Sequence, residues 1–195
     1  MRDGGCVASV RAEPQWMRRT GIVLVVDDSP IDRELIVAGL RLAGLEKEIR
    51  TAEDGAQAIA YLSGQDKFAD RAANPYPCFV LTDLKMPVAD GFAVLEYMRS
   101  RPDLAMIPTV VFSGSSDPDD VKTAYQLGAA SYIAKPGTGD ELRKCLRLVY
   151  EYWTLCEVPP ALLTGESVKT ESRGKLGERF SHPPFGRDQE QRRKA

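Results

Sequence analysis

Five polar residues stand directly after four apolar runs of the sequence, and their types are those used in chemistry on phosphate. They are Asp27, Asp28, Asp83, Ser113 and Lys135. Three carboxylates packed together repel one another, and burial would raise their pKa values unless a cation joined them. A hard divalent cation removes that repulsion, and Mg²⁺ usually takes one or two carboxylates together with phosphate oxygens.

An aspartate in such a cluster can itself accept a phosphoryl group covalently. Phosphoryl transfer mainly requires that the reactants are positioned and that charge on the equatorial oxygens is neutralised. A metal ion, the ammonium of Lys135 and the hydroxyl of Ser113 would meet these requirements if they lay near Asp83.

The elements that must carry these residues alternate between strands and helices. Five β-branched or aliphatic runs are typical of strands, at residues 22–26, around 49, 79–82, 109–112 and 130–134. Helix starts are marked by Ser29-Pro30 and Asp117-Pro118, where an N-cap residue precedes proline at the first helical position. Five strands alternating with five helices predict an α/β fold with a doubly wound, five-stranded parallel sheet.

Apolar residues at helical spacing define the first and last of these helices. In the first helix they are Ile31, Leu35, Ala38 and Leu42. Thr138 and Glu141 form a capping box that opens the last helix, and Asp54 with Gln57 resembles another for the second helix. The residues of the last helix that we expect to face inward are Leu142, Leu146, Val149 and Trp153.

The predicted topology brings the polar strand ends to one edge of the sheet. Ligands of open parallel sheets bind outside the carboxyl ends of the strands, and four of the five predicted strands end in the polar residues named above. Taken singly, each residue is more simply a helix cap or a solvated strand end. Their convergence favours one site that holds three aspartates, a hydroxyl and an ammonium.

Composition bounds the remaining possibilities. The chain has 195 residues, of which 43% are hydrophobic and 28% charged, with a net charge of −2, as in a globular protein with one sizeable core. The near-neutral balance argues against a dedicated nucleic-acid binder. No apolar run approaches the roughly 20 residues that cross a bilayer.

The two ends of the chain lack periodicity. We expect residues 1–20 to form a disordered extension and residues 161–195 a flexible polar tail. The first segment lacks the apolar stretch of a signal peptide, and Met17 within it is a candidate natural start. The four cysteines match no disulfide or zinc framework, and Cys78 and Cys145 are expected to be core thiols, which suits a cytoplasmic protein.

Four separated segments resemble the signature blocks of response-regulator receiver domains, in order. They are VLVVDDSP (23–30), FVLTDLKMPVADGF (79–92), PTVVFSGSS (108–116) and GAASYIAKP (128–136). The resemblance covers residues 21–160 and implies a CheY-like sheet with strand order 2-1-3-4-5. It also implies a two-component phosphoacceptor protein that works with a histidine kinase and Mg²⁺ and signals by docking.

The resemblance implies a role for each matching residue. Asp83 would be the phosphoacceptor and a metal ligand, together with Asp28, the backbone carbonyl of Lys85, and Asp27 through water. The side chains of Ser113 and Lys135 would each contact a phosphoryl oxygen.

Two implied features concern conformation. The Lys135-Pro136 peptide bond would be cis, and Tyr132 would be a switch residue that swings inward when Ser113 moves toward the phosphoryl group. The plainer alternative for Tyr132 is an ordinary residue of an amphipathic strand.

Two segments narrow the resemblance to single-domain regulators that are paired with bacterial phytochrome-type histidine kinases. They are the long connection at residues 64–77 and the sequence YEYWTLCEVPP at 150–160. Such relatives often form homodimers. The aromatic residues Tyr150, Tyr152 and Trp153 could either extend a dimer interface or close the core of the monomer.

Other functions fit the sequence less well. An aspartyl-phosphate phosphatase of the haloacid-dehalogenase type needs a second aspartate two residues after its nucleophile, where this chain has Lys85. A degenerate receiver that serves only as a scaffold would not need the intact polar set. His182 lies in the polar tail and does not suit a phosphohistidine donor, while Lys85 and Ser115 occupy positions that often tune dephosphorylation.

Overall fold

The computed structural model describes residues 22–156. The predicted extension (1–20), the polar tail (161–195), Met17 and His182 lie outside the described residues. The elements in chain order are β1 (Val23–Val26), α2 (Pro30–Leu42), β2 (Ile49–Ala52), α3 (Gly55–Ser63), the 3₁₀ helix η1 (Asp66–Phe68), β3 (Phe79–Thr82), α4 (Gly91–Ser100), β4 (Thr109–Ser113), α5 (Pro118–Gln126), β5 (Ser131–Ala134) and α6 (Gly139–Leu155).

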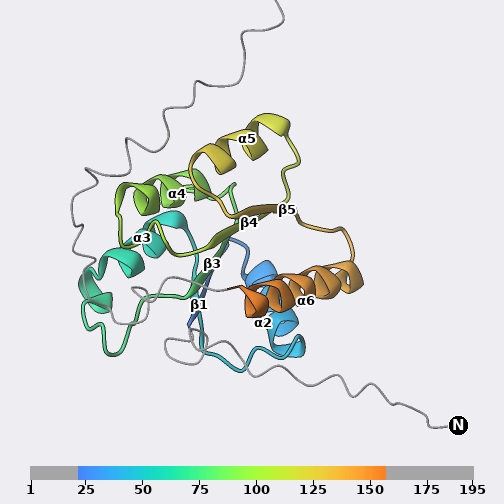
Figure 1. The fold of residues 1–195 in the computed structure, drawn as a ribbon, viewed down its shortest axis with the longest axis horizontal. Coiled ribbons are helices and arrows are strands. Elements are labelled where there is room, and N and C mark those ends of the chain that lie inside the picture. The colour runs from blue at the N-terminus through green and yellow to red at the C-terminus, as the bar shows by residue number, and fades with distance from the viewer. Residues whose placement is uncertain (1–21, 157–195) are drawn as a thin grey trace, which may run out of the picture.

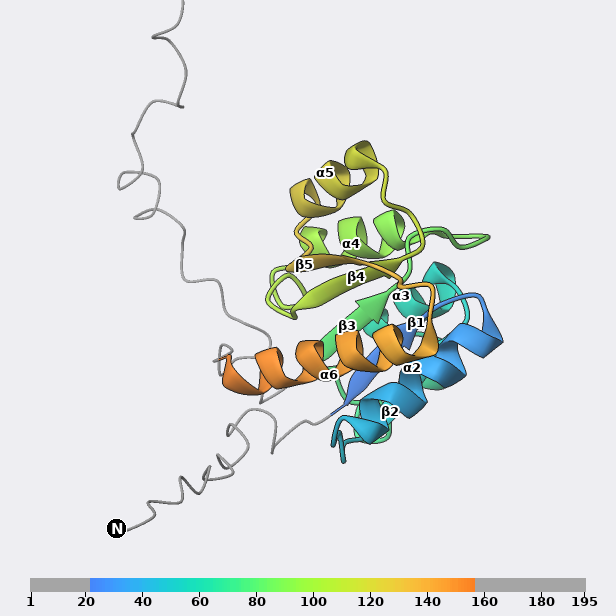
Figure 2. The same cartoon turned by 90° about the vertical axis from the view of Figure 1, so that its right-hand side faces the viewer.

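The five strands form one parallel sheet in the order β2-β1-β3-β4-β5, as predicted. Helices α2 and α6 lie side by side on one face, and α3, α4 and α5 cover the other (Figures 1 and 2). Val26, the last residue of β1, is paired with both Ala52 and Thr82. The carboxyl ends of the first three strands in the sheet are therefore level at one edge.

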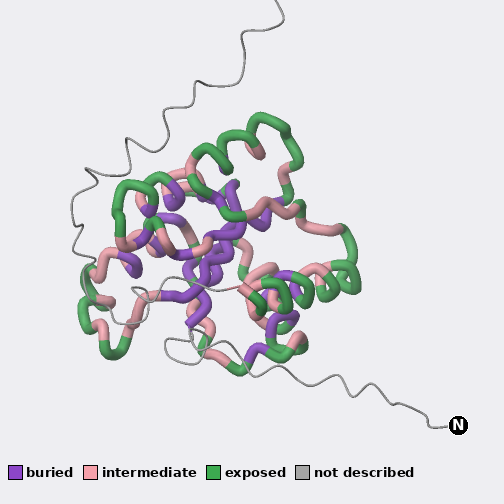
Figure 3. The backbone as a smooth tube through the Cα atoms, viewed as in Figure 1, coloured by how far each residue is buried: buried purple, intermediate pink, exposed green. Residues whose placement is uncertain are grey.

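The central strands supply a hydrophobic layer to each face of the sheet. Val23 and Val25 pack with α2 and α6, whereas Leu24 and Val26 pack with α3 and α4. Every residue of β1 and β3 is buried, so the buried trace runs through the middle of the molecule in Figure 3. Burial on both faces explains why these strands are continuous apolar runs and do not alternate with polar residues.

The face of helix α2 that packs on the core is not the face that carries the regularly spaced apolar residues of the sequence analysis. Ile31, Leu35 and Leu42 are 69%, 46% and 75% exposed, whereas Ile36 and Leu40 are 2% exposed. Gly39 belongs to the buried face, and a Cβ added there would clash with the side chain of Leu146 on α6. Because glycine has no apolar side chain, the hydrophobic pattern of the sequence does not indicate that α2 and α6 approach closely here.

Helix α6 packs as the sequence predicts. Leu146 and Val149 are buried, and Leu142 and Trp153 pack against the same cluster. The ring of Trp153 lies 5.6 Å from that of Phe79 between centroids.

The three aromatic residues near the end of α6 were expected either to close the core of the monomer or to extend a dimer interface, and they do not all behave alike. Trp153 and Tyr150 close the core of the monomer, and the Tyr150 hydroxyl donates to the Gly44 carbonyl at 3.2 Å. Tyr152, in contrast, is 60% exposed.

The long connection before β3 is organised around Arg71. Its guanidinium donates to the carbonyls of Tyr61 and Leu62 at 2.8 and 2.7 Å and lies 4.2 Å from the centre of the Tyr76 ring. Arg71 thus adds donors to carbonyls in the last turn of α3, where a helix is short of amide partners for them.

Two expectations from composition can be compared with the structure. Within residues 22–156 no helix is both long and apolar enough to cross a membrane. Cys78 is buried in the core and Cys145 packs against it, both as free thiols, as predicted.

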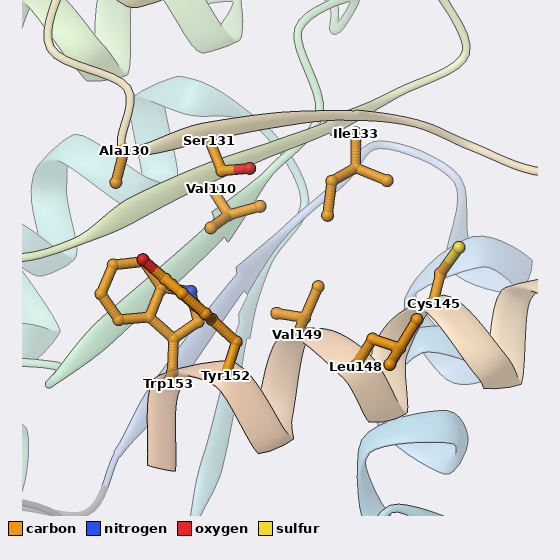
Figure 4. Close-up of a pocket in the computed structure, with 9 residues that line it drawn as sticks. All are labelled: Val110, Ala130, Ser131, Ile133, Cys145, Leu148, Val149, Tyr152 and Trp153. Atoms are coloured by element: carbon orange, nitrogen blue, oxygen red, sulfur yellow. The ribbon is translucent and has the colours of Figure 1, made fainter. Parts of the chain in front are cut away.

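A groove of about 320 Å³ runs between β5 and α6 (Figure 4). It is lined by Val110, Ala130, Ser131, Ile133, Cys145, Leu148, Val149, Tyr152 and Trp153. Because β5 is the last strand of the sheet, the groove lies at the sheet's edge. Its α6 side carries the exposed side chains of Leu148 and Tyr152.

Candidate metal and phosphoryl site

The polar strand ends meet at one edge of the sheet because the backbone ladder continues one residue past the strands. The Asp83 amide donates to the Val26 carbonyl at 2.8 Å, and the Lys135 amide donates to the Ser113 carbonyl at 2.7 Å. These bonds fix the backbones of Asp83 and Lys135 before their side chains make any contact. Asp27, Asp28, Asp83, Ser113 and Lys135 are all brought to this edge, as predicted.

Asp83 is 8% exposed, and both of its carboxylate oxygens accept hydrogen bonds. Oδ1 accepts from the Ser113 hydroxyl at 2.6 Å and from the Leu84 amide at 2.5 Å, and the Lys85 amide lies 3.3 Å away. Oδ2 accepts from the Lys135 ammonium at 2.8 Å. The carboxylate is therefore held in one orientation by groups from three neighbouring segments.

The loop after Asp83 depends on Gly91, the first residue of α4. The Gly91 amide donates to the Leu84 carbonyl at 3.0 Å, and a Cβ at this position would clash with the Asp83 carbonyl. Asp90 caps the helix by accepting from the Ala93 amide at 2.9 Å. The start of α4 thus packs directly against the backbone of the acceptor residue.

The ammonium of Lys135 is shared by three carboxylates. It lies 2.6 Å from Asp27, 2.8 Å from Asp32 and 2.8 Å from Asp83. Burial alone would lower the pKa of Lys135, but the hydrogen bonds to these carboxylates outweigh it and raise the pKa above its ordinary value. The lysine is therefore a permanent cation in the centre of an acidic cluster.

The expectation of a cis peptide bond at Lys135-Pro136 is wrong. The described residues contain no cis peptide bond, so this bond is trans. The trans isomer is the commoner one for bonds that precede proline, and Lys135 reaches all three carboxylates from it.

Three carboxylates form a possible metal site beside this ammonium. Oxygens of Asp27, Asp28 and Asp83 all lie within 4.8 Å of one another. Asp27 and Asp83 are buried, whereas Asp28 is exposed and open to an incoming ion. A set made only of carboxylate oxygens fits a hard divalent cation that keeps some of its waters.

Burial makes the negative charge of Asp27 costly. Desolvation raises the pKa of Asp27 above its ordinary value, although Lys135 and the Ser29 amide oppose that shift. A divalent cation bound beside Asp27 would act in the same direction as Lys135, because it would favour the ionised carboxylate.

Asp32 contributes to the cluster and was missed by sequence reasoning. It stands in the first turn of α2, where an acidic residue needs no further explanation than the helix dipole. The sequence offered one indication of this contact: Asp32 follows the N-cap Ser29 by three residues, in the first turn of α2, close to the edge of the sheet.

Tyr132 lies close to the site on β5. Its ring packs, partly buried, against the cluster of Leu84 and Val111, and its hydroxyl donates to the Ser115 carbonyl at 2.8 Å. It is thereby connected to the loop that follows Ser113. Its role as a switch residue remains a prediction.

Comparison with known proteins identifies the family. Residues 23–147 match the model of the response regulator receiver domain, which is more than half of the chain. The chain belongs to the response-regulator receiver family. As a receiver it is a signalling protein of two-component systems, and receivers are phosphorylated by histidine kinases.

Several known response regulators are similar to this chain. The response regulator Rcp1 of Synechocystis sp. is 31% identical over 140 residues, which cover 72% of this chain and 93% of Rcp1. The solved structure of the phosphorylated cyanobacterial phytochrome response regulator RcpA has 32% identity and a TM-score of 0.67, over 71% of this chain and 97% of RcpA. The Mn²⁺-bound form of Rcp1 has 31% identity and a TM-score of 0.65, over 71% of this chain and 98% of that one.

Proposed function

We propose that Asp83 is the residue on which this response regulator accepts a phosphoryl group from a histidine kinase. The observation that carries the proposal is the shared contact of Asp83 with the Lys135 ammonium and the Ser113 hydroxyl, at 2.8 and 2.6 Å, beside two further carboxylates. These are the groups that transfer of a phosphoryl group requires: an acceptor oxygen, fixed donors for the transferred oxygens and a place for a cation.

In the transfer, a carboxylate oxygen of Asp83 attacks the phosphorus of the donor phosphohistidine. The bond from phosphorus to the imidazole nitrogen breaks, and its electron pair stays with the imidazole. The ammonium of Lys135 and the hydroxyl of Ser113 are each bound to Asp83 beforehand and can bind the oxygens of the arriving phosphoryl group instead.

The metal that we propose for this site is Mg²⁺. Asp28, Asp83 and the backbone carbonyl of Lys85 would hold it directly, and Asp27 would do so through water. When bound, the ion would neutralise negative charge on the phosphoryl oxygens. The acidic cluster and the likeness to a Mn²⁺-bound regulator support a divalent cation, and the preference of Mg²⁺ for carboxylates with phosphate oxygens supports this choice.

The output of phosphorylation would be a change of shape. If Ser113 turns toward a phosphoryl group, it leaves Asp83, and the loop that carries Ser115 moves with it. The hydroxyl of Tyr132 is bonded to that loop, so we propose that Tyr132 transmits the change to the surface of α5 and β5.

The proposed phosphoryl donor is a phytochrome-type histidine kinase, because the similar protein RcpA is a phytochrome response regulator. We place the pair in the cytoplasm, where the free thiols of Cys78 and Cys145 would remain reduced. Beyond its own phosphorylation and dephosphorylation, we propose no catalytic activity for this chain.

A second copy of this chain is the proposed occupant of the groove between β5 and α6 (Figure 4). Leu148 and Tyr152 are 52% and 60% exposed at its α6 side, next to Leu155 at 64%. In a twofold dimer the same patch faces itself, so these protruding side chains of one copy would enter the groove of the other.

The oligomeric state tests this interface. Leu148→Gln should lower the dimer fraction in sedimentation measurements, while Leu42→Gln, at an equally apolar exposed position on α2, should leave it unchanged. Equal behaviour of both variants would remove the groove as the interface.

The acceptor residue can be identified chemically. Borohydride reduces an aspartyl phosphate to homoserine, so protein labelled by acetyl phosphate and then reduced should carry homoserine at position 83. A label at any other aspartate of the cluster would contradict the assignment.

A further inference from the structure

The side chain of Lys85 forms an ion pair with an aspartate of helix α5. Its ammonium lies 2.8 Å from Oδ2 of Asp120, in the first turn of α5. The backbone of Lys85 nevertheless stays beside Asp83, since its amide is 3.3 Å from the Asp83 carboxylate. The loop after β3 is thereby connected to the start of α5.

The same oxygen of Asp120 also binds the loop after β4. The hydroxyl of Ser115 donates to Asp120 Oδ2 at 2.6 Å. The Ser115 amide lies 3.4 Å from the hydroxyl of Ser113, and its carbonyl accepts from Tyr132 at 2.8 Å. Asp120 therefore joins the loop after β3, which begins with Asp83, to the loop after β4 through a single carboxylate oxygen.

The ion pair has little value for stability alone. The Lys85 side chain is 62% exposed and that of Asp120 is 16% exposed, and ion pairs that are open to solvent contribute little to stability. Asp120, however, is held independently of Lys85, by Ser115 and by its place at the N-terminus of a helix, which favours a negative charge. Asp120 is therefore held in place without Lys85.

We propose that Asp120 is a positioning residue that sets the lifetime of the phosphoryl group by holding Lys85 and Ser115 as one unit beside Asp83. This inference rests on the proposed function of Asp83. In hydrolysis, a water oxygen attacks the phosphorus, the bond from phosphorus to the Asp83 oxygen breaks, and the carboxylate leaves with the electron pair. Inorganic phosphate is released, and the proton of the attacking water passes to the phosphate or to solvent.

The contacts of Asp120 with Lys85 and Ser115 slow hydrolysis of the aspartyl phosphate in two ways. They keep the two loops together next to the acceptor, which restricts the approach of water. They also hold the Lys85 ammonium on Asp120, where that charge cannot neutralise the phosphoryl oxygens during attack. Loss of the Asp120 carboxylate removes both restraints, so hydrolysis becomes faster.

The test is the hydrolysis rate of the aspartyl phosphate in the full chain, at fixed Mg²⁺. Protein labelled with acetyl phosphate is separated from the reagent, and the labelled fraction is followed by intact mass. Asp120→Asn should hydrolyse about two- to five-fold faster than the wild type, the factor that corresponds to an exposed ion pair. Asp119→Asn, which removes a neighbouring charge outside this connection, should leave the rate unchanged.

A double-mutant cycle separates positioning from general destabilisation. Lys85→Gln breaks the same pair but also removes the ammonium, so it should accelerate hydrolysis less than Asp120→Asn does. Adding Asp120→Asn to Lys85→Gln should have less effect than Asp120→Asn alone. Melting temperatures should remain close to that of the wild type in all variants. Labelled protein with unchanged lifetime in both single variants, or fully additive effects, would overturn this inference alone, whereas a wild type that takes no label would overturn the proposed function as well.

Discussion

The ammonium of Lys135 lies 2.8 Å from the carboxylate of Asp83, although 52 residues separate them in the chain. The contact exists because β4 lies between β3 and β5, so that the ends of these strands are close together. The same ammonium contacts Asp27 at the end of β1 and Asp32 at the start of α2. One cation therefore compensates carboxylates from three separate segments.

Replacing Lys135 should destabilise the protein in the absence of metal. Lys135→Ala leaves Asp27 and Asp83, which are 1% and 8% exposed, without their shared cation. We expect the free energy of unfolding by urea to fall by about 2–3 kcal/mol, and Mg²⁺ to restore more of it in the variant than it adds to the wild type.

Lys122→Ala, at an exposed position on α5, is the control. It should change neither the free energy of unfolding nor the stabilisation that Mg²⁺ adds. If Mg²⁺ stabilised the wild type and Lys135→Ala equally, the lysine and the metal would not be compensating the same carboxylates.

Asp28 is expected to be a direct ligand of the divalent cation. Asp28→Ala should weaken Mg²⁺ binding by roughly tenfold or more in calorimetric titration, because it removes the exposed carboxylate of the cluster. Glu53→Ala removes an exposed carboxylate that follows β2 at the same edge but lies outside the cluster, and it should leave the affinity unchanged. Equal affinities for all three proteins would exclude Asp28 from the ligand set.

The first turn of α4 has no room for a side chain against the acceptor. Gly91→Ala would force a Cβ into the carbonyl of Asp83 and should lower the free energy of unfolding by about 1–3 kcal/mol. Gly114→Ala is the matched control, since nothing lies within 4 Å of a Cβ there. Thermal unfolding measures both, and a Gly91→Ala protein as stable as the control would show that this contact is readily relieved.

Burial of Cys78 makes stability depend on alkaline pH. Desolvation raises the pKa of its thiol from 9.0 to about 11. Because the folded pKa is the higher one, the contribution to stability is complete below pH 9 and is lost as the pH rises through 11.

The expected loss at pH 10 is roughly 1–2 kcal/mol. The stability of the wild type relative to Cys78→Ala, measured by urea unfolding at pH 8 and pH 10, should shrink by that amount. The comparison with the variant cancels the titration of lysines and tyrosines, which both proteins share. A difference that does not change with pH would mean that the thiol ionises equally in the folded and unfolded chains.

Local signals in the sequence predicted the elements well. Ser29, Asp54, Asp117 and Thr138 all cap the helices that they were expected to open. Their side chains act on amides two or three residues away, so their effect can be read without knowledge of the fold. The strand ends could be predicted for a similar reason, because buried parallel strands are continuous apolar runs.

Some contacts that depend on which face a helix turns to its neighbours could not be predicted. The spacing of Ile31 and Leu35 indicates a helix, but which face meets α6 is decided by Gly39, where the absence of a side chain allows Leu146 to approach. Asp32 and Asp120 are hidden in the same way. Each looks like an acid that suits a helix dipole, and only the fold places Lys135 beside one and Lys85 beside the other.

The central claim is that Asp83 accepts a phosphoryl group with the help of a divalent cation. The most direct test is the intact mass of the full chain after incubation with acetyl phosphate, with and without Mg²⁺, for the wild type and for Asp83→Asn. We predict a single phosphoryl adduct on the wild type that requires Mg²⁺ and is absent from the folded variant. An adduct of equal yield on Asp83→Asn, or none on a folded wild type that a histidine kinase also fails to label, would contradict the claim.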